Sequence, residues 1–315
     1  MMSVQILMST YNGEKYIKTQ LDSLLNQNYY DIDILIRDDG SSDSTCKIIE
    51  EYVQKFSNIS WYSGKNIGVQ RSFFDLISKA DLGKDYFAFA DQDDKWLPEK
   101  ISRAVSILEK YSSKIPVLYC SDKIIVDENL QPLKVTVKRI MKTPSFGNAL
   151  VQDMCTGCTA VMNKTLLKLI QYAIPDYAIM HDWWFYLTAT CFGEVYYDKK
   201  SYILYRQHGN NTSGAMVRKR DLVKYRIQQL FKPRGEIYQQ AQNFLNIYAN
   251  KNAIGRQDIL TNAVISSSNM KLIRDLLKSR VNPIYRIKLL INPQIYRQKA
   301  SDTLVLKLII LIGKL

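Results

Sequence analysis

The sequence predicts an α/β protein whose mixed, mainly parallel sheet is flanked by helices and followed by a basic helical extension at the C-terminus. Short apolar segments alternate with amphipathic ones over roughly the first 110 residues, a pattern typical of parallel sheets with right-handed crossovers. The chain has 315 residues, 46% of them hydrophobic, which is enough to bury a full core. Its last hundred residues differ sharply in charge from the rest.

The expected strands are short apolar segments bounded by turn residues. They cover Val4–Met8, Ile32–Ile36, Ile59–Ser63, Tyr86–Ala90 and a segment from Val117 into Tyr119, Cys120, Ser121 and Asp122. Beyond this last strand the pattern becomes less regular. The strand assignment is therefore firmest in the first half of the chain.

The expected helices lie between these strands and are predicted by helical spacing, cap residues or a proline suited to a first turn. The residues that predict them are Ile17, Leu21, Leu24 and Leu25; Ser41–Ser44 before Ile49, Val53 and Phe56; Ser72–Lys79; and Pro98 before Ile101, Val105 and Leu108.

The charge is concentrated at the C-terminal end. Residues 216–315 contain 19 Lys or Arg and 5 Asp or Glu, whereas residues 1–215 contain 24 and 25. We expect a main domain over residues 1–215 and a basic helical region over residues 216–315, whose partner would be nucleic acid or anionic lipid. The apolar segment 304–312 is too short to span a bilayer but suits its interface, which favours membrane association. The alternative is a helix that packs on the main domain or on a second copy of the chain.

The five cysteines are scattered and odd in number, which is typical of a reducing compartment rather than of a disulfide framework. Cys155 and Cys158 form a CxxC motif, but no second pair follows and the only histidines are His181 and His208, so a zinc site is not favoured. No signal peptide is expected, because the N-terminus begins as a strand, and no apolar segment is long enough to span a bilayer.

Polar side chains follow three of the expected strands, at residues 9–12, 38–41 and 91–94. Ligands of open α/β sheets bind beyond these carboxyl ends. Asp91, Asp93 and Asp94 are three carboxylates within four positions, and they repel one another unless a cation lies between them. Mg²⁺ or Mn²⁺ typically bridges carboxylates to substrate phosphates. Because the glycine-rich motifs GxGxxG and GxxxxGK[ST] are absent, we expect phosphate to be held through such a cation.

The segments ILMSTYNGEKYI, RDDGSSD and DQDD resemble those of the family 2 glycosyltransferases, which have the Rossmann-like GT-A fold. MHDWW at residues 180–184 and LYRQHGNN at residues 204–211 are similar to the bacterial rhamnosyltransferase branch. The resemblance covers about residues 3–215, with five motifs in the family's order. It implies a donor half over about residues 1–120 and an acceptor half over about residues 121–215.

The resemblance also implies a nucleotide-sugar donor, an inverting displacement and the roles of particular residues. Asp93 would ligate Mn²⁺ or Mg²⁺, with Asp91 and His208 as further candidate ligands, and Asp182 would be the general base. The residues implied for the nucleotide and donor are Ser9, Thr10, Tyr11, Asp38, Asp39, Asn66, Arg71, Asp91, Gln92, Arg206, Asn210 and Asn211. Those implied for the acceptor are Thr156, Gly157, His181, Trp183 and Trp184.

Several of these residues have a structural alternative. Asp38 and Asp39 suit a turn or a helix cap, and Asp94 suits a cap for the helix at Pro98. His181 is either a partner that orients Asp182 or a buried residue, and His208 is either a metal ligand, a donor to the diphosphate or a structural histidine. Because imidazole is not a usual ligand of Mg²⁺, His208 in the site would favour Mn²⁺.

We therefore predict transfer of L-rhamnose from dTDP-rhamnose to a lipid-linked or growing cell-surface polysaccharide, such as capsule or cell wall, by a cytoplasmic protein bound peripherally to the inner face of the membrane. UDP-galactose and UDP-glucose are alternative donors. Processive synthesis is not expected, because the Gln-x-x-Arg-Trp motif is absent. A sugar nucleotidyltransferase would carry a glycine- and lysine-rich loop, unlike MSTYNGEKY. Nucleic-acid binding, suggested by the pI of about 9.3, is disfavoured because the basic region lies apart from the acidic motifs.

Overall fold

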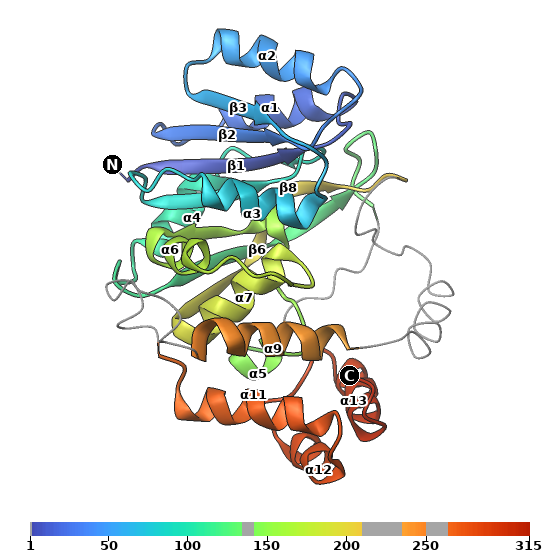
Figure 1. Cartoon of the computed structure of the whole chain (residues 1–315). Coiled ribbons are helices and arrows are strands. Elements are labelled where there is room, and N and C mark those ends of the chain that lie inside the picture. The colour runs from blue at the N-terminus through green and yellow to red at the C-terminus, as the bar shows by residue number, and fades with distance from the viewer. Residues whose placement is uncertain (1, 134–141, 210–234, 250–263) are drawn as a thin grey trace.

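The computed structural model describes residues 2–133, 142–209, 235–249 and 264–315. Its centre is one eight-stranded sheet in the order β3-β2-β1-β4-β7-β6-β8-β5 (Figure 1). The strands are β1 Val4–Thr10, β2 Ile32–Asp38, β3 Ile59–Ser63, β4 Tyr86–Ala90, β5 Lys95–Trp96, β6 Val117–Val126, β7 Val161–Asn163 and β8 Glu194–Arg206.

The first four strands are parallel, as predicted, and they bring the polar segments together. β1 pairs with both β2 and β4, with Thr10 opposite Asp38 and Met8 opposite Ala90. β7 is antiparallel to β4 and β6, and β5 is antiparallel to β8, so the sheet is mixed. Because parallel neighbours end at the same edge, the segments that follow β1, β2 and β4 meet there.

Helices cover both faces of the sheet (Figure 1). Those of the first 192 residues are α1 Ile17–Leu25, α2 Thr45–Lys55, α3 Val69–Ser78, α4 Lys100–Leu108, α5 Phe146–Ala149, η1 Gly157–Thr159, α6 Lys164–Tyr172 and α7 His181–Phe192. The four helices predicted before residue 110 are confirmed, although α3 begins three residues earlier than expected, directly after Gly68, whose φ of +83° favours glycine.

The strands divide the core into two apolar layers. Side chains alternate along each strand, so Leu7 and Phe87 face one layer while Ile6 and Ala88 face the other. The first layer includes residues of α3, α6 and α7, and the second includes residues of α1, α2 and α4. Burial on both faces explains why these strands are continuous apolar segments in the sequence.

The C-terminal helices pack on the main domain rather than standing apart from it (Figure 1). They are α9 Glu236–Ala249, α11 Ser267–Ser279, α12 Pro283–Ile291 and α13 Ala300–Leu311. Phe244 of α9 is fully buried, with its ring centroid 5.4 Å from that of Trp184 and 6.0 Å from that of Phe192 in α7. The predicted boundary between residues 215 and 216 lies outside the described residues. Within the described part of the chain, each helix is too short or too polar to cross a bilayer.

Candidate active site

A cleft of about 1030 Å³ opens at the edge of the sheet where the parallel strands end. It is bounded by the ends of β1 and β4, the loop of residues 153–157 and the first turn of α7. Thirteen residues singled out from the sequence line it: Ser9, Thr10, Tyr11, Asp39, Asn66, Asp91, Gln92, Asp93, Thr156, Gly157, His181, Asp182 and His208. Residues implied for the donor and for the acceptor therefore border the same cavity.

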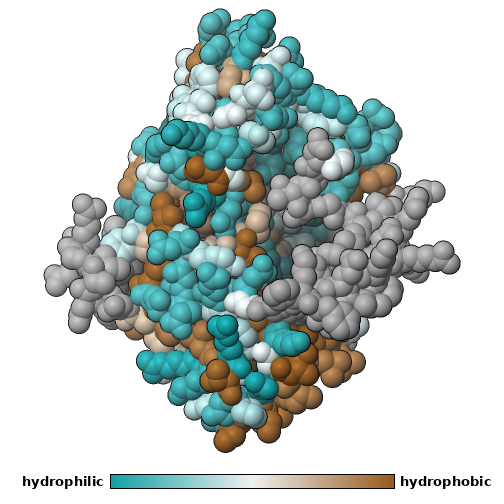
Figure 2. All heavy atoms as spheres, turned by 45° about the vertical axis from the view of Figure 1, so that its right-hand side comes forward, coloured by the Kyte–Doolittle hydropathy of each residue, from teal (hydrophilic) through white to brown (hydrophobic). Residues whose placement is uncertain are grey.

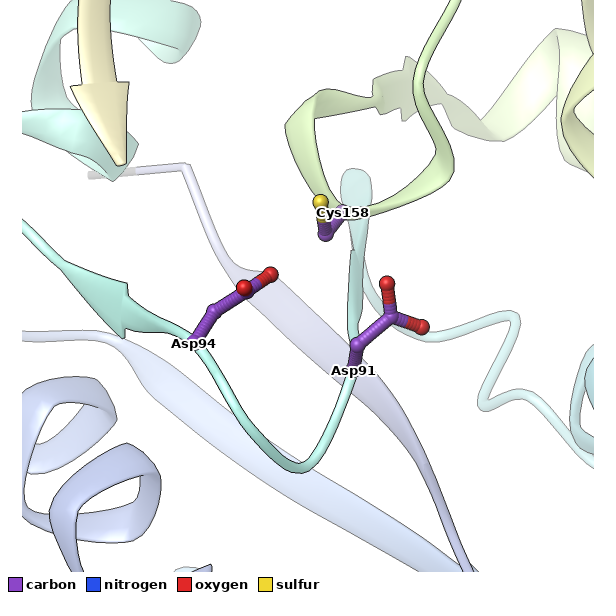
Figure 3. Close-up of side chains that lie close together, drawn as sticks. All are labelled: Asp91, Asp94 and Cys158. Atoms are coloured by element: carbon purple, nitrogen blue, oxygen red, sulfur yellow. The ribbon is translucent and has the colours of Figure 1, made fainter. Parts of the chain in front are cut away.

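The acidic segment after β4 folds back on itself, so that two of its carboxylates face one thiol (Figure 3). Asp91, Asp94 and Cys158 each offer one potential ligand atom, and these atoms lie within 4.8 Å of one another. Asp94 does not cap α4 as its alternative role suggested, because its Oδ1 accepts a hydrogen bond from the backbone N–H of Arg206 at 3.0 Å. Its buried Oδ2 has no hydrogen-bond donor among the described residues.

Asp91 and Asp94 of this segment hold their protons far more tightly than usual, because their pKa values are raised. Burial raises the pKa of Asp91 to about 7, and the nearby charges of Asp93 and Asp182 add to the shift. Burial, with Asp93 and Asp91, likewise raises the pKa of Asp94 well above its ordinary value. The residues of the cleft thus do not fully offset the negative charge that ionised carboxylates would bring here. Such an imbalance is expected of a site that binds a cation.

The donor set of this segment suits a divalent cation. Nε2 of His208 lies 2.7 Å from Oδ2 of Asp93, so an imidazole and a carboxylate meet at the cleft wall. Burial raises the pKa of the Cys158 thiol well above its ordinary value, so the sulfur stays protonated and is a poor ligand. Carboxylate oxygens with one imidazole nitrogen fit Mn²⁺ better than Mg²⁺.

Asp38 builds the turn after β2 and does not line the cleft. It is fully buried, and it accepts hydrogen bonds from the N–H groups of Gly40 and Ser41 at 3.0 and 2.8 Å and from Oγ1 of Thr10 at 3.1 Å. Burial by itself would raise the pKa of Asp38, but these bonds outweigh it and lower the pKa. The expectation that Asp38 contacts the nucleotide is therefore corrected, because its oxygens are used within the protein.

Asp39 lies beside it but faces the cleft. Its carboxylate pairs with Nη1 of Arg37 at 2.5 Å and accepts hydrogen bonds from the N–H groups of Ile67 and Gly68 at 2.9 and 2.8 Å. These contacts fix the loop that carries Asn66 against the end of β2. The predicted contact of Asp39 and Asn66 with a nucleotide stays a prediction.

Gln92 locks the segment after β4 to the end of β1. Its Oε1 accepts a hydrogen bond from the N–H of Tyr11, and its Nε2 donates to the carbonyl of Tyr11, both at 2.8 Å. The amide of Gln92 is thereby engaged with backbone, while the ring of Tyr11 is left 47% exposed at the cleft. Of these two residues, the tyrosine ring is the better placed to stack on a base.

Asp182 sits in the first turn of α7 with both oxygens oriented by backbone donors. Oδ2 accepts a hydrogen bond from the N–H of Gly157, and Oδ1 accepts one from the N–H of Trp183, both at 2.9 Å. The approach of Gly157 depends on its lack of a side chain, because a Cβ there would lie 2.6 Å from Nε2 of His181. The carboxylate is therefore held at the cleft wall by the first turn of α7 and by the backbone of Gly157.

The aromatic residues around Asp182 are mainly core residues. His181 lines the cleft, but it is buried and stacks on Phe73 with ring centroids 4.1 Å apart, and burial lowers its pKa. Trp184 is fully buried against α9, so the expectation that its ring stacks on a sugar is corrected. Trp183 does not line the cleft, and its indole N–H donates to the carbonyl of Ala149 at 2.6 Å. Its predicted contact with the acceptor stays a prediction.

The remaining expected phosphate contacts are less well placed. Arg206 is buried, and its Nε donates to the backbone carbonyl of Asp93 at 2.6 Å, so it braces the acidic segment. Arg71 is exposed on α3 and does not line the cleft. Asn210 and Asn211 lie outside the described residues.

Asp153 and Lys123 are among the cleft residues that were missed from the sequence. Asp153 lies within hydrogen-bonding reach of Asp182, and burial together with the charge of Asp182 raises its pKa well above the ordinary value. Lys123 donates to Oγ1 of Thr156 at 3.1 Å, and its ammonium lies 4.0 Å from the ring centroid of Tyr205. Neither residue belongs to a recognisable motif. Asp153 could have been considered only because it lies two residues before Cys155, the first cysteine of the CxxC motif.

Residues 5–170 match the family described as Glycosyl transferase family 2. The chain belongs to this family. It is 34% identical over 226 residues to the dTDP-rhamnosyl transferase RfbG of Shigella flexneri. The aligned region covers 67% of this chain and 74% of that relative. A member of this family is a glycosyltransferase, which accounts for the acidic cleft at the end of β4.

Solved structures agree with the GT-A fold of this glycosyltransferase. The crystal structure of residues 1–349 of S. aureus TarS in complex with UDP-GlcNAc has a TM-score of 0.56 at 19% identity, covering 90% of this chain and 86% of that one. The mannosyltransferase PcManGT from Pyrobaculum calidifontis, in complex with GDP-Man and Mn²⁺, has a TM-score of 0.50 at 14% identity and covers 99% of this chain and 85% of that one. At these identities the likeness concerns the fold alone.

Proposed function

We propose that this glycosyltransferase is a metal-dependent, inverting enzyme that transfers L-rhamnose from dTDP-rhamnose to a lipid-linked or growing cell-surface polysaccharide. The observation that carries the proposal is the pairing, in one cleft, of an unbalanced acidic segment after β4 with the oriented carboxylate of Asp182. The first suits a diphosphate held through a cation, and the second suits a general base.

The choice of dTDP-rhamnose is supported by the 34% identity to the rhamnosyl transferase of Shigella flexneri. A UDP-sugar is the alternative donor, and the TarS complex with UDP-GlcNAc is an example on the same fold. In either case we propose that Tyr11 and Asp39 contact the base and ribose, because both line the cleft beside the ends of β1 and β2.

Asp93, Asp91 and His208 would hold the divalent cation. His208 and Asp93 are in contact at 2.7 Å, and burial together with the charges of Asp93 and Asp182 raises the pKa of Asp91. When bound, a divalent cation would offset the negative charge that grows on the departing nucleoside diphosphate. The imidazole favours Mn²⁺ over Mg²⁺.

Asp182 would act on the acceptor. Its carboxylate accepts the proton of an acceptor hydroxyl while that oxygen forms a bond to the anomeric carbon and the bond from this carbon to the diphosphate breaks. Attack from the side opposite the leaving group inverts the configuration. Thr156 and Gly157 line the cleft beside Asp182, and we propose that they border the acceptor hydroxyl.

A lipid-linked acceptor would place the enzyme at the inner face of the cell membrane, held peripherally by its C-terminal region. A homo-oligomer formed through the same region is the alternative. The membrane association is supported by a C-terminal region with 19 basic and 5 acidic residues, which suits an anionic lipid surface.

The test is a screen of donor hydrolysis with dTDP-rhamnose, UDP-galactose and UDP-glucose, each in EDTA and then with Mn²⁺ or Mg²⁺ restored. We expect turnover of dTDP-rhamnose alone, absent in EDTA and restored best by Mn²⁺. Turnover of a UDP-sugar in its place would reassign the donor, and full activity in EDTA would remove the metal from the mechanism.

A further inference from the structure

The C-terminal helices α12 and α13 leave an unusual apolar surface, which we name the aliphatic face. It consists of exposed aliphatic side chains on these helices and just beyond their ends: Val281, Ile284, Ile287, Ile291, Leu304, Val305, Leu308, Leu311 and Ile312. Figure 2 shows hydrophobic side chains gathered at the lower end of the molecule, where Figure 1 places α12 and α13. An exposed set of this kind marks an interaction site in a soluble domain.

Helical spacing puts these side chains on the outward faces of both helices. In α12, Ile284, Ile287 and Ile291 recur at three and four residues, and Leu289 points inward and is buried. In α13, Leu308 is exposed while Leu306, Ile309 and Ile310 are buried in the core shared with the main domain. A helix that is apolar all round needs a covering on every side, and the protein covers one side of α13.

The surroundings of the aliphatic face are strongly basic. Residues 264–315, all of them described, contain 10 Lys or Arg and 2 Asp or Glu. Arg280, Lys288 and Lys314 are exposed next to members of the face. Aliphatic side chains framed by lysine and arginine match the interface of an anionic bilayer, where the apolar groups enter the acyl boundary and the cations meet the headgroups.

The composition of the face argues against a second copy of the chain as its occupant. Its nine members are all Val, Ile or Leu, whereas protein–protein interfaces are enriched in aromatic residues and methionine and depleted in lysine. A matching face on a second copy would also bring two sets of positive charges together, which is unfavourable.

The aliphatic face is tied by hydrogen bonds to the acceptor side of the cleft. In the segment that joins α12 to α13, the carbonyl of Tyr296 accepts a hydrogen bond from Nδ2 of Asn148 at 2.9 Å, and the N–H of Gln298 donates to Oε1 of Gln152 at 2.8 Å. Gln152 is followed directly by Asp153, which lines the cleft. The aliphatic face is therefore connected, through this linker, to the segment that leads to the part of the cleft containing Asp182.

We propose that the aliphatic face of α12 and α13 docks on an anionic lipid bilayer and so presents the Asp182 side of the cleft to an acceptor at the membrane surface. The presentation of Asp182 to an acceptor rests on the proposed function, whereas the docking assigns a surface to the membrane association proposed there and does not depend on the donor or the reaction. The docking surface includes α12 and is wider than the apolar segment 304–312 that the sequence singles out.

The experiment measures sedimentation of the full chain with vesicles of phosphatidylcholine alone or mixed with phosphatidylglycerol. Deleting residues 304–315 would be a poor test, because it removes buried core residues such as Leu306. The double variant I287E/L308E instead changes two outward side chains that are 57% and 54% exposed. Its matched control, L82E/I174E, adds the same charge at aliphatic residues of the main domain that are 40% and 37% exposed.

We expect the wild type and the control to bind the mixed vesicles, with binding weakened by salt, and I287E/L308E to bind at least about tenfold more weakly. Circular dichroism and donor hydrolysis, which needs no lipid, should be unchanged in both variants. Absence of wild-type binding, or equal binding of I287E/L308E and wild type, would overturn the proposal. So would a dimer that this variant converts to monomers while vesicles capture none of the proteins. Loss of donor turnover in the wild type would contradict the proposed function without affecting the docking.

Discussion

Two groups of carboxylates follow β2 and β4, the strands that flank β1, yet their surroundings in the folded protein are opposite. Asp38 and Asp39, after β2, are surrounded by donors that the chain itself supplies, and the pKa of Asp38 is lowered. Asp91 and Asp94, after β4, lie among other carboxylates, and their pKa values are raised. The protein itself supplies hydrogen-bond donors to the first group, whereas the carboxylates of the second group lie closest to one another.

This difference shows how a structural carboxylate can be distinguished from a ligand-binding one in an acidic motif, namely by the partners that surround it in the fold. The carboxylates after β2 accept hydrogen bonds that hold a turn and a loop, whereas Asp91 and Asp94 after β4 lie close to other carboxylates that oppose their ionisation. Charge that the fold leaves unbalanced at a cleft is a mark of a binding site. The following predictions test this division, beginning with the largest expected effect.

Asp93→Asn should lower sugar transfer by about a thousandfold, because it removes a carboxylate from the proposed cation site and from its contact with His208. Transfer would be measured with saturating donor over a range of Mn²⁺ concentrations. Asp33→Asn, which alters a carboxylate paired with Lys84 outside the cleft, is the control and should leave the rate unchanged. Near-normal transfer by Asp93→Asn in EDTA would show that the carboxylates after β4 do not form a cation site, and would contradict the contrast drawn with those after β2.

Asp182→Asn should reduce transfer by about a hundredfold or more, since the amide cannot accept the acceptor's proton. Donor affinity should stay within about twofold, because Asp182 acts on the acceptor. The amide oxygen can keep only one of the two backbone hydrogen bonds that Gly157 and Trp183 donate to separate oxygens of Asp182, so circular dichroism should confirm that the variant is folded. Calorimetry with the nucleoside diphosphate would measure the affinity, and single-turnover assays the transfer. A normal rate would assign the base to another residue.

Asp38→Asn should destabilise the protein by about 2 kcal/mol, because a neutral amide cannot accept the full set of hydrogen bonds that the buried carboxylate receives. The free energy of unfolding would be measured in urea, without metal. Asp91→Asn is the matched change in the other group, and it should leave the metal-free protein equally or more stable at about pH 8, because it removes an unbalanced charge. If Asp38→Asn and Asp91→Asn lower the free energy of unfolding by the same amount, the proposed contrast between the two groups of carboxylates is wrong.

The pH dependence of stability should differ in sign between the two groups. The folded protein keeps a proton on Asp91 up to about pH 7, so the unfolding free energy falls as pH rises from about 4 to 7, by at most about 1.4 kcal/mol per pH unit. Asp38, with its lowered pKa, contributes stability that is present above its ordinary pKa of 3.8 and lost as the pH falls below it. Urea titrations in EDTA should show a smaller fall between about pH 4 and 7 for Asp91→Asn than for wild type. If the unfolding free energies of Asp91→Asn and wild type change with pH in the same way, the raised pKa of Asp91 is contradicted.

The sequence by itself determined the elements of about the first 110 residues and the edge of the sheet at which their polar segments meet. Apolar strands such as Ile59–Ser63 and helix-spaced residues such as Leu21 are local signals, because a strand buried on both faces needs a continuous apolar segment. Parallel pairing then fixes the common edge, so that Asp39, Asp91 and Asp93 could be expected in one cleft.

The tertiary structure alone decided which of those side chains are satisfied by the protein and which await a ligand. Nothing in RDDGSSD indicates that Asp38 is fully enclosed while Asp39 faces the cleft, because the donors come from Thr10 and from the loop before α3. Trp184 was misplaced for the same reason, since α9, some sixty residues later, covers its ring. Burial and hydrogen bonding depend on partners distant in the chain, and these determine the charge state of each group.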